Sequence, residues 1–523
     1  MYKQYNMDQV VLPLDLEMKL DEKDIAYTVH HLVEQIPNEA FSSFVRETGC
    51  PAYHPRMMMK IILCAYTQSV FSGRKIEGLL TDSVRMMWLS QGYVPCYRTI
   101  NRFRVHPEVK HLLRQGFVQF RCQLVQKKLI DAEAIFIDGT KIEANANKFT
   151  FVWRKSVEKF SASLMEKSSQ IYDELLKKDI ILAIERESQE ELKIEELSVI
   201  AKKLEEKVED LTQKIEASDD MKVRKELRSM RKEPKKLHKM FSDFMRRKQK
   251  YENDMKIFKE RNSYSKTDLD ATFMRMKDDY MKNGQLKPGY NVQIATQGQF
   301  TLAYDLFPNP TDTRTFIPFL NHIEKHFFTL PEYIVADAGY GSEENYADVI
   351  ENRKRTPLIT YNTYRKENKK NFKKNEFHAA NWTYKEEDDS FICPQEKRLP
   401  FQYVSHRTDR NGFKREMKVY ECEDCSDCPL RAQCTKAKDG NNRKVYYNEK
   451  WEQQKNQIKQ QLSEEKTGSI YAQRKIDVEP VFGYLKANLR FNRMSVRGKN
   501  RVENELGFAF MAVNLKKYTA MNT

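Results

Sequence analysis

The stretch Ala134-Ile-Phe-Ile-Asp138-Gly139 decides the fold, because it is a short apolar run that ends in an aspartate and a glycine. Its β-branched and aromatic residues predict a buried strand with Asp138 at the carboxyl end. A second run of this kind, Tyr333-Ile-Val-Ala-Asp337, lies far along the chain and is also followed by glycine. Ligand sites in α/β sheets gather at the carboxyl ends of strands, so we expect Asp138 and Asp337 to lie side by side.

The surrounding sequence predicts the rest of an α/β fold. Residues 290–296 and 300–306 alternate as antiparallel strands do, with a glycine-containing turn between them. Residues 313–328 read as a helix and residues 357–360 as a further strand. We therefore expect a mixed sheet with flanking helices, built from residues 129–153 and 266–363 and interrupted by two insertions.

The first 128 residues predict an all-helical domain that binds DNA. Its last short helix carries Arg98, Asn101, Arg102 and Arg104, and a helix rich in Arg and Asn is suited to a major groove. The alternative is a helical bundle whose arginines are simply solvated. Residues 154–265 are dominated by Lys, Glu and Arg, and their heptad seam predicts a coiled-coil-like helical hairpin that turns near residues 217–220. Its charges indicate a solvated face, or contact with DNA or a second subunit.

A basic, irregular segment at residues 364–450 contains a dense cysteine array. In a chain without a secretory signal pattern, such clustering indicates metal binding rather than disulfides. Four thiolates suffice for a tetrahedral Zn²⁺ site, and reduced cysteines without a metal are the alternative. The preferred ligands are Cys393, Cys425, Cys428 and Cys434, with Cys422 as the substitute for one of them.

Two aspartates held side by side repel each other unless a cation lies between them, and oxygen ligands suit Mg²⁺ or Mn²⁺. A third carboxylate would complete a two-metal site for chemistry at phosphorus. The best place to seek it is the helix within residues 451–523, where Tyr471, Arg474, Glu479 and Lys486 follow one another. Taken alone, this helix is an ordinary amphipathic one.

The order of these motifs resembles the DDE transposases of bacterial insertion sequences. The motifs are Phe-Ile-Asp138-Gly-Thr, Val-Ala-Asp337-Ala-Gly and Tyr471-x2-Arg474-x4-Glu479-x6-Lys486. Within these transposases, the likeness is to the group called insertion-sequence family 1182, which is related to family 4. The resemblance runs from about residue 15 to residue 519 and includes Tyr53-His-Pro-Arg and Lys287-Pro-Gly-Tyr-Asn-Val-Gln.

The resemblance implies an RNase H-like core in which Asp138, Asp337 and Glu479 bind two Mg²⁺ or Mn²⁺ ions. Tyr471, Arg474 and Lys486 match the residues that accompany the glutamate and position phosphates. The family 4 pattern has three residues between the arginine and the glutamate, whereas this sequence has four. Asp477 is therefore a rival for the third carboxylate.

The implied activity is cleavage of double-stranded DNA at the ends of the element and joining of the 3′-hydroxyl ends to target DNA. A homodimer is expected, because two ends must be brought together. The chain has 523 residues with 90 Lys and Arg against 75 Asp and Glu, a net charge of +15 that favours a polyanionic partner. Further phosphate contacts are expected from Arg490, Arg493 and Arg497.

Neither a secretory signal nor a run of apolar residues long enough to cross a membrane is visible, which predicts a cytoplasmic, nucleoid-associated protein. Two other functions fit the same motifs. One is a non-catalytic DNA-binding protein that derives from a transposase, and the other is a metal-dependent nuclease that never rejoins ends.

Overall fold

The computed structural model describes residues 20–44, 52–184, 191–276, 284–367, 369–409 and 412–521. The chain divides into two compact units, residues 143–289 and the remainder on either side of them. Within the described residues, no helix has both the length and the apolar character that a membrane span requires.

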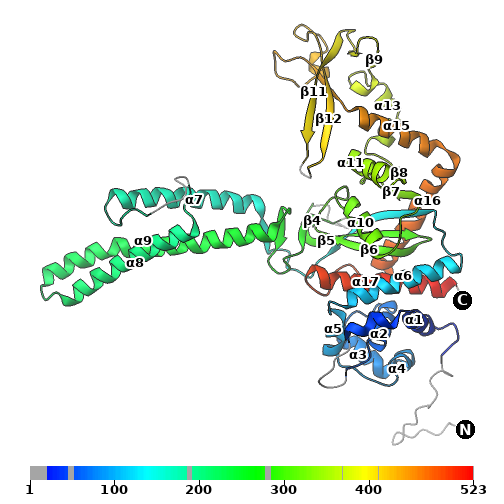
Figure 1. The fold of residues 1–523 in the computed structure, drawn as a ribbon, viewed down its shortest axis with the longest axis horizontal. Helices are drawn as coiled ribbons and strands as arrows, with labels where there is room; N and C mark the ends of the chain where they lie inside the picture. Colours follow the sequence, from blue (N-terminus) through cyan, green and yellow to red (C-terminus); the bar gives the residue numbers. More distant parts are fainter. Residues whose placement is uncertain are drawn as a thin grey trace, which may run out of the picture. The chain divides into compact units, whose positions relative to one another are not determined.

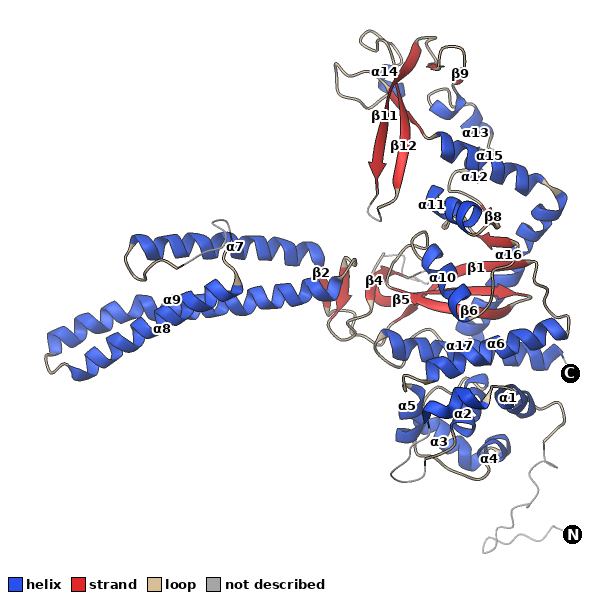
Figure 2. Ribbon diagram, in the orientation of Figure 1, coloured by secondary structure: helices blue, strands red, loops and turns tan. Residues whose placement is uncertain are grey.

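The larger unit contains the strands β5, β1, β7 and β8 of a mixed sheet, in that order, and β6 pairs with β5 (Figures 1 and 2). β4 belongs to the smaller unit, where it pairs with the first residues of β5. β7 pairs in parallel with both β1 and β8, and β6 is antiparallel to β5. The predicted strands are therefore present, and the predicted turn between β5 and β6 is at Gly298 and Gln299. The strand bounds are β1 Ala134–Glu143, β4 Thr272–Arg275, β5 Leu286–Gln297, β6 Phe300–Phe307, β7 Tyr333–Ala336 and β8 Thr356–Ile359.

Helices α6 (Val109–Gln126) and α17 (Lys499–Met521) pack on β6 (Figure 1). α17 is buried on nearly all sides between Val502 and Leu515, because it lies between the sheet and the N-terminal helices. The helices that precede and follow the strands are α10 Phe316–His326, α11 Glu343–Ala347, α15 Glu449–Ser463 and α16 Glu465–Gly483.

The N-terminal residues are helical, as the sequence predicts. Between Gly73 and Ser90 the helical backbone is interrupted at Ser83, whose extended conformation separates two short helices. The elements are α1 Ile25–Glu34, a 3-10 helix Asn38–Phe44, α2 Pro55–Thr67, α3 Gly73–Asp82, α4 Val84–Ser90 and α5 Tyr97–Arg104.

The basic segment before α15 is more regular than its sequence indicates. Five strands form an antiparallel sheet in the order β13-β12-β11-β10-β9, around a small core that includes Trp382, Phe391 and Tyr420. The interpretation of this segment as irregular was wrong, because its longest strand, β11, is mostly exposed and three of the others span only three or four residues. The bounds are α12 Tyr364–Glu367, α13 Lys370–Lys373, β9 Thr383–Lys385, β10 Ser390–Ile392, β11 Arg398–Thr408, β12 Lys414–Glu421, α14 Arg431–Cys434 and β13 Lys444–Tyr447.

The smaller unit contains three long helices, α7 (Arg154–Lys177), α8 (Ile194–Ala217) and α9 (Met221–Phe258), and the strands β2 (Phe151–Trp153) and β3 (Ser263–Ser265). The chain turns between α8 and α9 at residues 218–220, where the heptad pattern places the turn. The two helices pack along an apolar seam, and α7 adds a third layer to it that the heptad pattern does not predict. α9 runs unbroken through Pro234.

Candidate active site

The register of the sheet brings the first two predicted carboxylates together. In the parallel pair of β1 and β7, Ile137 is opposite Ala336. Asp138 and Asp337 come next, so they occupy neighbouring positions where the pairing ends. Asp337 directly follows β7, but the prediction that Asp138 ends its strand was wrong, because β1 continues to Glu143 beyond the end of its partner β7. Both side chains are half-buried. Each carboxylate accepts a hydrogen bond from a following glycine, Asp138 from the N–H of Gly139 and Asp337 from that of Gly339, both at 2.7 Å.

A third carboxylate, Asp312, lies at the same place and was missed from the sequence. A Cβ atom at Gly139 would lie 2.9 Å from the Asp312 Oδ1 atom, and one at Gly339 would lie 3.9 Å from its Oδ2 atom. Gly139 is therefore required by the close approach of Gln293 and Asp312, whereas the close neighbour of Gly339 is the Asp337 carboxylate. The segment Asn-Pro-Thr-Asp312-Thr between β6 and α10 has no pattern that singles out this aspartate.

A buried tyrosine, Tyr340, lies within electrostatic reach of the three carboxylates. The hydroxyl of Tyr340 donates to the side-chain oxygen of Gln293, and Tyr340 has no exposed surface. Burial raises its pKa well above the usual value, and the negative charges of Asp312, Asp138 and Asp337 raise it further. The negative charges of all three aspartates therefore reach the buried hydroxyl of Tyr340.

Helix α16 brings Arg474 and Tyr471 to the same edge of the sheet. The Arg474 guanidinium lies 3.8 Å from the Asp138 carboxylate, and both side chains are 13% exposed. The hydroxyl of Tyr471 is 3.0 Å from that of Thr360, which directly follows β8. Half-buried beside a carboxylate, Arg474 is placed to meet a phosphate at the strand ends.

Glu479 does not join the aspartates in this structure. Its side chain is exposed, and it follows Arg474 by five positions, which is about 140° around an α-helix. When Arg474 faces Asp138, Glu479 therefore faces solvent. The helix is irregular just beyond this point, since Pro480 lacks an N–H group and a π-helical turn follows at Tyr484–Asn488.

The rival carboxylate Asp477 has a structural environment. It is 7% exposed and accepts hydrogen bonds from the Thr296 hydroxyl at 2.6 Å and from the Gln299 N–H at 3.2 Å. Burial raises its pKa, against the effect of these donors. Through these hydrogen bonds, Asp477 connects α16 to the turn between β5 and β6 and to Thr296 of β5.

The other residues predicted to contact DNA are distributed over two regions. Lys486 is half-buried in the π-helical turn, and the exposed arginines Arg490, Arg493 and Arg497 lie in the loop before α17. On α5, Arg98 and Arg102 are exposed and Asn101 is half-buried. Exposed arginines of this kind are available to a polyanion.

Arg104 does not share that exposure. Its guanidinium is buried, and it donates to the hydroxyl of Tyr66, the backbone oxygen of Phe71 and the side chain of Asn101. Glu505 of α17 lies 3.9 Å away. In this structure, Arg104 joins the N-terminal helices to α17 instead of facing a DNA groove, and no local pattern reveals a partner 401 positions away along the chain.

The five clustered cysteines meet in one place. They line a cavity of about 20 Å³ beside three cationic side chains, Lys397, Arg431 and Arg443. The backbone N–H of Arg443 donates to the Sγ atom of Cys425 at 3.4 Å. Burial raises the pKa values of Cys422 and Cys434. The cysteines are Cys393, Cys422, Cys425, Cys428 and Cys434.

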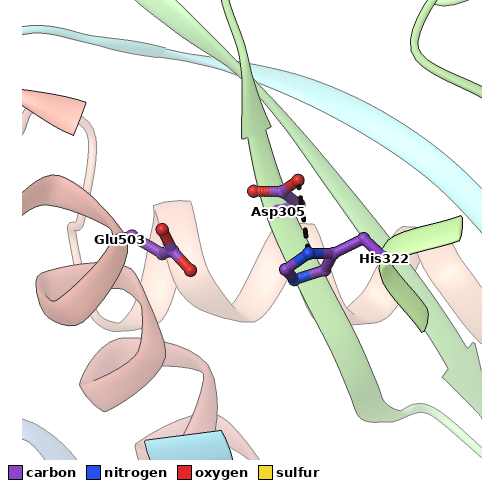
Figure 3. A group of neighbouring side chains, drawn as sticks. All are labelled: Asp305, His322 and Glu503. Atoms are coloured by element: carbon purple, nitrogen blue, oxygen red, sulfur yellow. Dashed lines mark ion pairs between the residues drawn. The ribbon is translucent and has the colours of Figure 1, made fainter. Parts of the chain in front are cut away.

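A different group has the tightest set of potential ligand atoms. Among the described residues, only Asp305, His322 and Glu503 place three such atoms within 4.8 Å of one another (Figure 3). Glu503 already pairs with Lys110 at 2.5 Å and with Arg114 at 3.2 Å. These two cations balance its charge and that of Asp305, so this group is an ion-pair network between α6, α10, α17 and β6.

Two segments of the chain match models of known protein families. Residues 392–519 match a transposase DDE domain, and residues 14–106 match a transposase domain of the type DUF772. The first match spans the cysteines and α16, and the second spans α1 to α5. Neither a curated protein nor a solved structure matched the chain. The matches support a DDE transposase, an enzyme that cuts DNA, while Asp138 and Asp337 lie outside the matched residues and rest on the geometry.

Proposed function

We propose that the protein is a DDE transposase that binds the ends of its insertion sequence, cleaves the DNA and joins the 3′-hydroxyl ends to target DNA. The observation that carries this proposal is the juxtaposition of Asp138 and Asp337 where the parallel pairing of β1 and β7 ends, with Arg474 beside Asp138. The order β6-β5-β1-β7-β8, with three parallel strands after an antiparallel pair, supports an RNase H-like core.

The donor set at the strand ends fits Mg²⁺ or Mn²⁺, because carboxylate oxygens are the ligands that these ions prefer. When bound there, two such ions would activate the attacking oxygen and neutralise charge on the phosphate. Asp138 and Asp337 would hold the ions. Arg474, Tyr471 and Lys486 would bind and orient the phosphate groups of the scissile strand.

Glu479 is the remaining carboxylate in this proposal, and the transposase DDE match that spans it is its support. Because its side chain is exposed in the structure, the proposal includes a rotation or local repacking of α16 when DNA and metal bind. The irregular helix around Pro480 and the following π-helical turn would accommodate that change at low cost.

Cleavage of DNA that carries the element ends, with Mg²⁺ or with EDTA, tests the proposal. Wild type should cut only with metal, and Asp138→Ala, Asp337→Ala and Glu479→Ala should not cut. Asp477→Ala is the matched control on α16 and should still cut, although with a lower melting temperature. Binding without cutting by the wild type would favour the non-catalytic protein, and cutting without joined products would favour a nuclease.

A structural Zn²⁺ site in the cysteine-lined cavity is a second part of the proposal. Four thiolates around Zn²⁺ carry a net charge of −2. Lys397 pairs with Asp424, which also lines the cavity, so Arg431 and Arg443 are the cations that would offset this charge. Metal analysis of purified protein should find zinc, and Cys428→Ser should lose it. Cys422→Ser should retain zinc if Cys422 is the spare cysteine.

The proposal assigns DNA binding to the exposed arginines and a homodimer to the active form. Arg98 and Arg102 would contact one element end, and Arg490, Arg493 and Arg497 would follow the strand that enters the active site. Two ends must be synapsed, so a dimer should appear by light scattering in the presence of end DNA. A monomer bound to a single end under all conditions would contradict this part of the proposal.

A further inference from the structure

Asp312 is fixed in position by two amides on the neighbouring strand. Its Oδ1 atom accepts hydrogen bonds from the Asn291 Nδ2 atom at 2.8 Å and from the Gln293 Nε2 atom at 3.1 Å. Asn291 and Gln293 have no exposed surface, and Gln293 is itself held by Tyr340. One oxygen of the carboxylate is thus fixed by β5, and this also sets the direction of the other oxygen.

The second oxygen, Oδ2, lies on the side of Asp337. A Cβ atom at Gly339 would lie 3.9 Å from Asp312 Oδ2 and 2.9 Å from Asp337 Oδ1, so both carboxylates border this glycine. The loop that carries Asp312 is also tied to the same turn, because the Thr313 hydroxyl donates to the backbone oxygen of Gly339 at 2.7 Å. Asp312 therefore belongs to the strand ends and not to the surrounding surface.

The negative charges of Asp312 and Asp337 would be stabilised by a bound cation. Among the described residues, Arg474 forms an ion pair with Asp138 at 3.8 Å, and Asp312 and Asp337 form none. Carboxylates that gather at one place repel each other unless positive charge balances them, and one arginine does not balance three aspartates.

We propose that Asp312 is a metal-binding carboxylate that shares a divalent cation with Asp337 and Asp138. This inference rests on the proposed function and deepens it, since it places on the β6–α10 loop a ligand that the DDE pattern does not contain. While Glu479 is exposed, as it is in this structure, Asp312 would supply the third oxygen donor once the three carboxylates draw together around the cation. The cation could then bind before α16 brings Glu479 in.

Titration of the full-length protein with Mn²⁺, followed by electron paramagnetic resonance, tests the inference directly. Asp312→Asn should weaken Mn²⁺ binding by about tenfold or more. Glu332→Gln is the matched control, since Glu332 is an exposed acid at the opposite end of β7 and should leave Mn²⁺ binding unchanged. Asp138→Asn reports on the proposed function itself.

The outcomes separate the two claims. If Asp138→Asn weakens Mn²⁺ binding and Asp312→Asn does not, the role of Asp312 is refuted and the proposed function stands. If neither variant weakens binding, the metal site of the proposed function fails together with the inference.

A second variant guards against a purely structural explanation. In Asp312→Cys, a thiolate replaces the carboxylate, and thiolates prefer softer metals than Mg²⁺. This variant should cleave end DNA with Mn²⁺ or Cd²⁺ but not with Mg²⁺. A residue that acts only as an acceptor for two amides would give the same activity with each metal, and that result would overturn the inference.

Discussion

The molecule contains two acidic clusters that look alike in composition and differ in how their charge is balanced. At Asp305, His322 and Glu503, the potential ligand atoms lie within 4.8 Å of one another (Figure 3). Lys110 and Arg114 of α6 already neutralise this cluster. At Asp138, Asp312 and Asp337, the atoms are less tightly gathered, and Arg474 is 3.8 Å from Asp138.

This difference teaches that proximity of ligand atoms is a weaker guide to a metal site than the balance of charge. A cluster closed by its own cations has no need of a metal, and a dication there would be repelled by Lys110 and Arg114. Beside Asp138, Asp312 and Asp337, the ion pair of the described residues is that of Arg474 with Asp138, so a bound cation would relieve the remaining repulsion. Substitutions at the two clusters should therefore have opposite consequences.

The largest effect is expected from Asp337→Asn. Loss of a metal ligand should remove several kcal/mol of transition-state stabilisation, which is about a thousandfold or more in the rate of cleavage. The same change removes one of two facing like charges, so the metal-free protein should melt at the same temperature as wild type or higher. Single-turnover cleavage and thermal melting in EDTA measure the two quantities. A fall in both would indicate that Asp337 supports the fold instead.

At the cluster of Asp305, His322 and Glu503, Glu503→Gln should reduce the stability of the fold. It should leave the dependence of DNA cleavage on Mg²⁺ unchanged. Glu503 is 2% exposed, and its loss leaves Lys110 and Arg114 without their shared partner. Breaking a buried ion pair in this way costs about 3–5 kcal/mol. Thermal melting should show the loss, while the Mg²⁺ concentration required for cleavage should stay unchanged. An altered requirement for Mg²⁺ would mean that this cluster binds the metal.

The same cluster should make stability depend on pH through His322. Burial, followed by the charge of Arg114, lowers the pKa of His322 to about 3. The unfolded chain has the ordinary value near 6.5, so the contribution of His322 is complete above that pH. As the pH falls below about 6.5, His322 binds a proton in the unfolded state but stays neutral in the folded state. The free energy of unfolding therefore decreases by up to about 1.4 kcal/mol per pH unit.

Melting temperatures between about pH 7 and pH 5 measure this contribution. His322→Gln should flatten the slope, and His326→Gln should flatten it less, because His326 is more exposed. Asp305 opposes the trend, since burial raises its pKa. Equal slopes in wild type and His322→Gln would refute the assignment. The charged groups that act on His322 from its surroundings are Arg114, Glu503, His326, Lys110 and Asp305.

The smallest effect is expected from substitution of single arginines on α5. It tests the difference between an exposed arginine and one that is buried and hydrogen-bonded inside the protein. Arg98→Ala should lower the salt dependence of DNA binding by about one unit of log–log slope, as expected for one lost phosphate contact. Arg104→Ala should instead lower the melting temperature, because its guanidinium bonds to Tyr66 and Phe71 inside the protein. A reduced salt slope for folded Arg104→Ala would contradict this division.

The central strands could be predicted from the sequence, and the arrangement of the site only in part. The apolar runs before Asp138 and Asp337 are local patterns, and their parallel register follows once both strands exist. Asp312 was beyond prediction, because only the approach of its loop to Gly139 and Gly339 distinguishes it from other loop aspartates.

The orientation of α16 shows the same limit. The extra residue between Arg474 and Glu479 is visible in the sequence, but which of the two faces the sheet depends on packing. Asp477 and its bond to Thr296 settle that packing in this structure, and Thr296 lies on a strand far away in the sequence. Helical spacing alone could not decide between Glu479 and Asp477 as the third carboxylate.

The most direct test of the central claim is to measure Mn²⁺ affinity in four full-length proteins, namely wild type, Asp138→Asn, Asp337→Asn and Glu503→Gln. The account predicts that both aspartate variants lose binding and that Glu503→Gln retains it once its melting temperature confirms that it is folded. Retention of binding by both aspartate variants, together with its loss in folded Glu503→Gln, would move the metal to the other cluster and contradict the account.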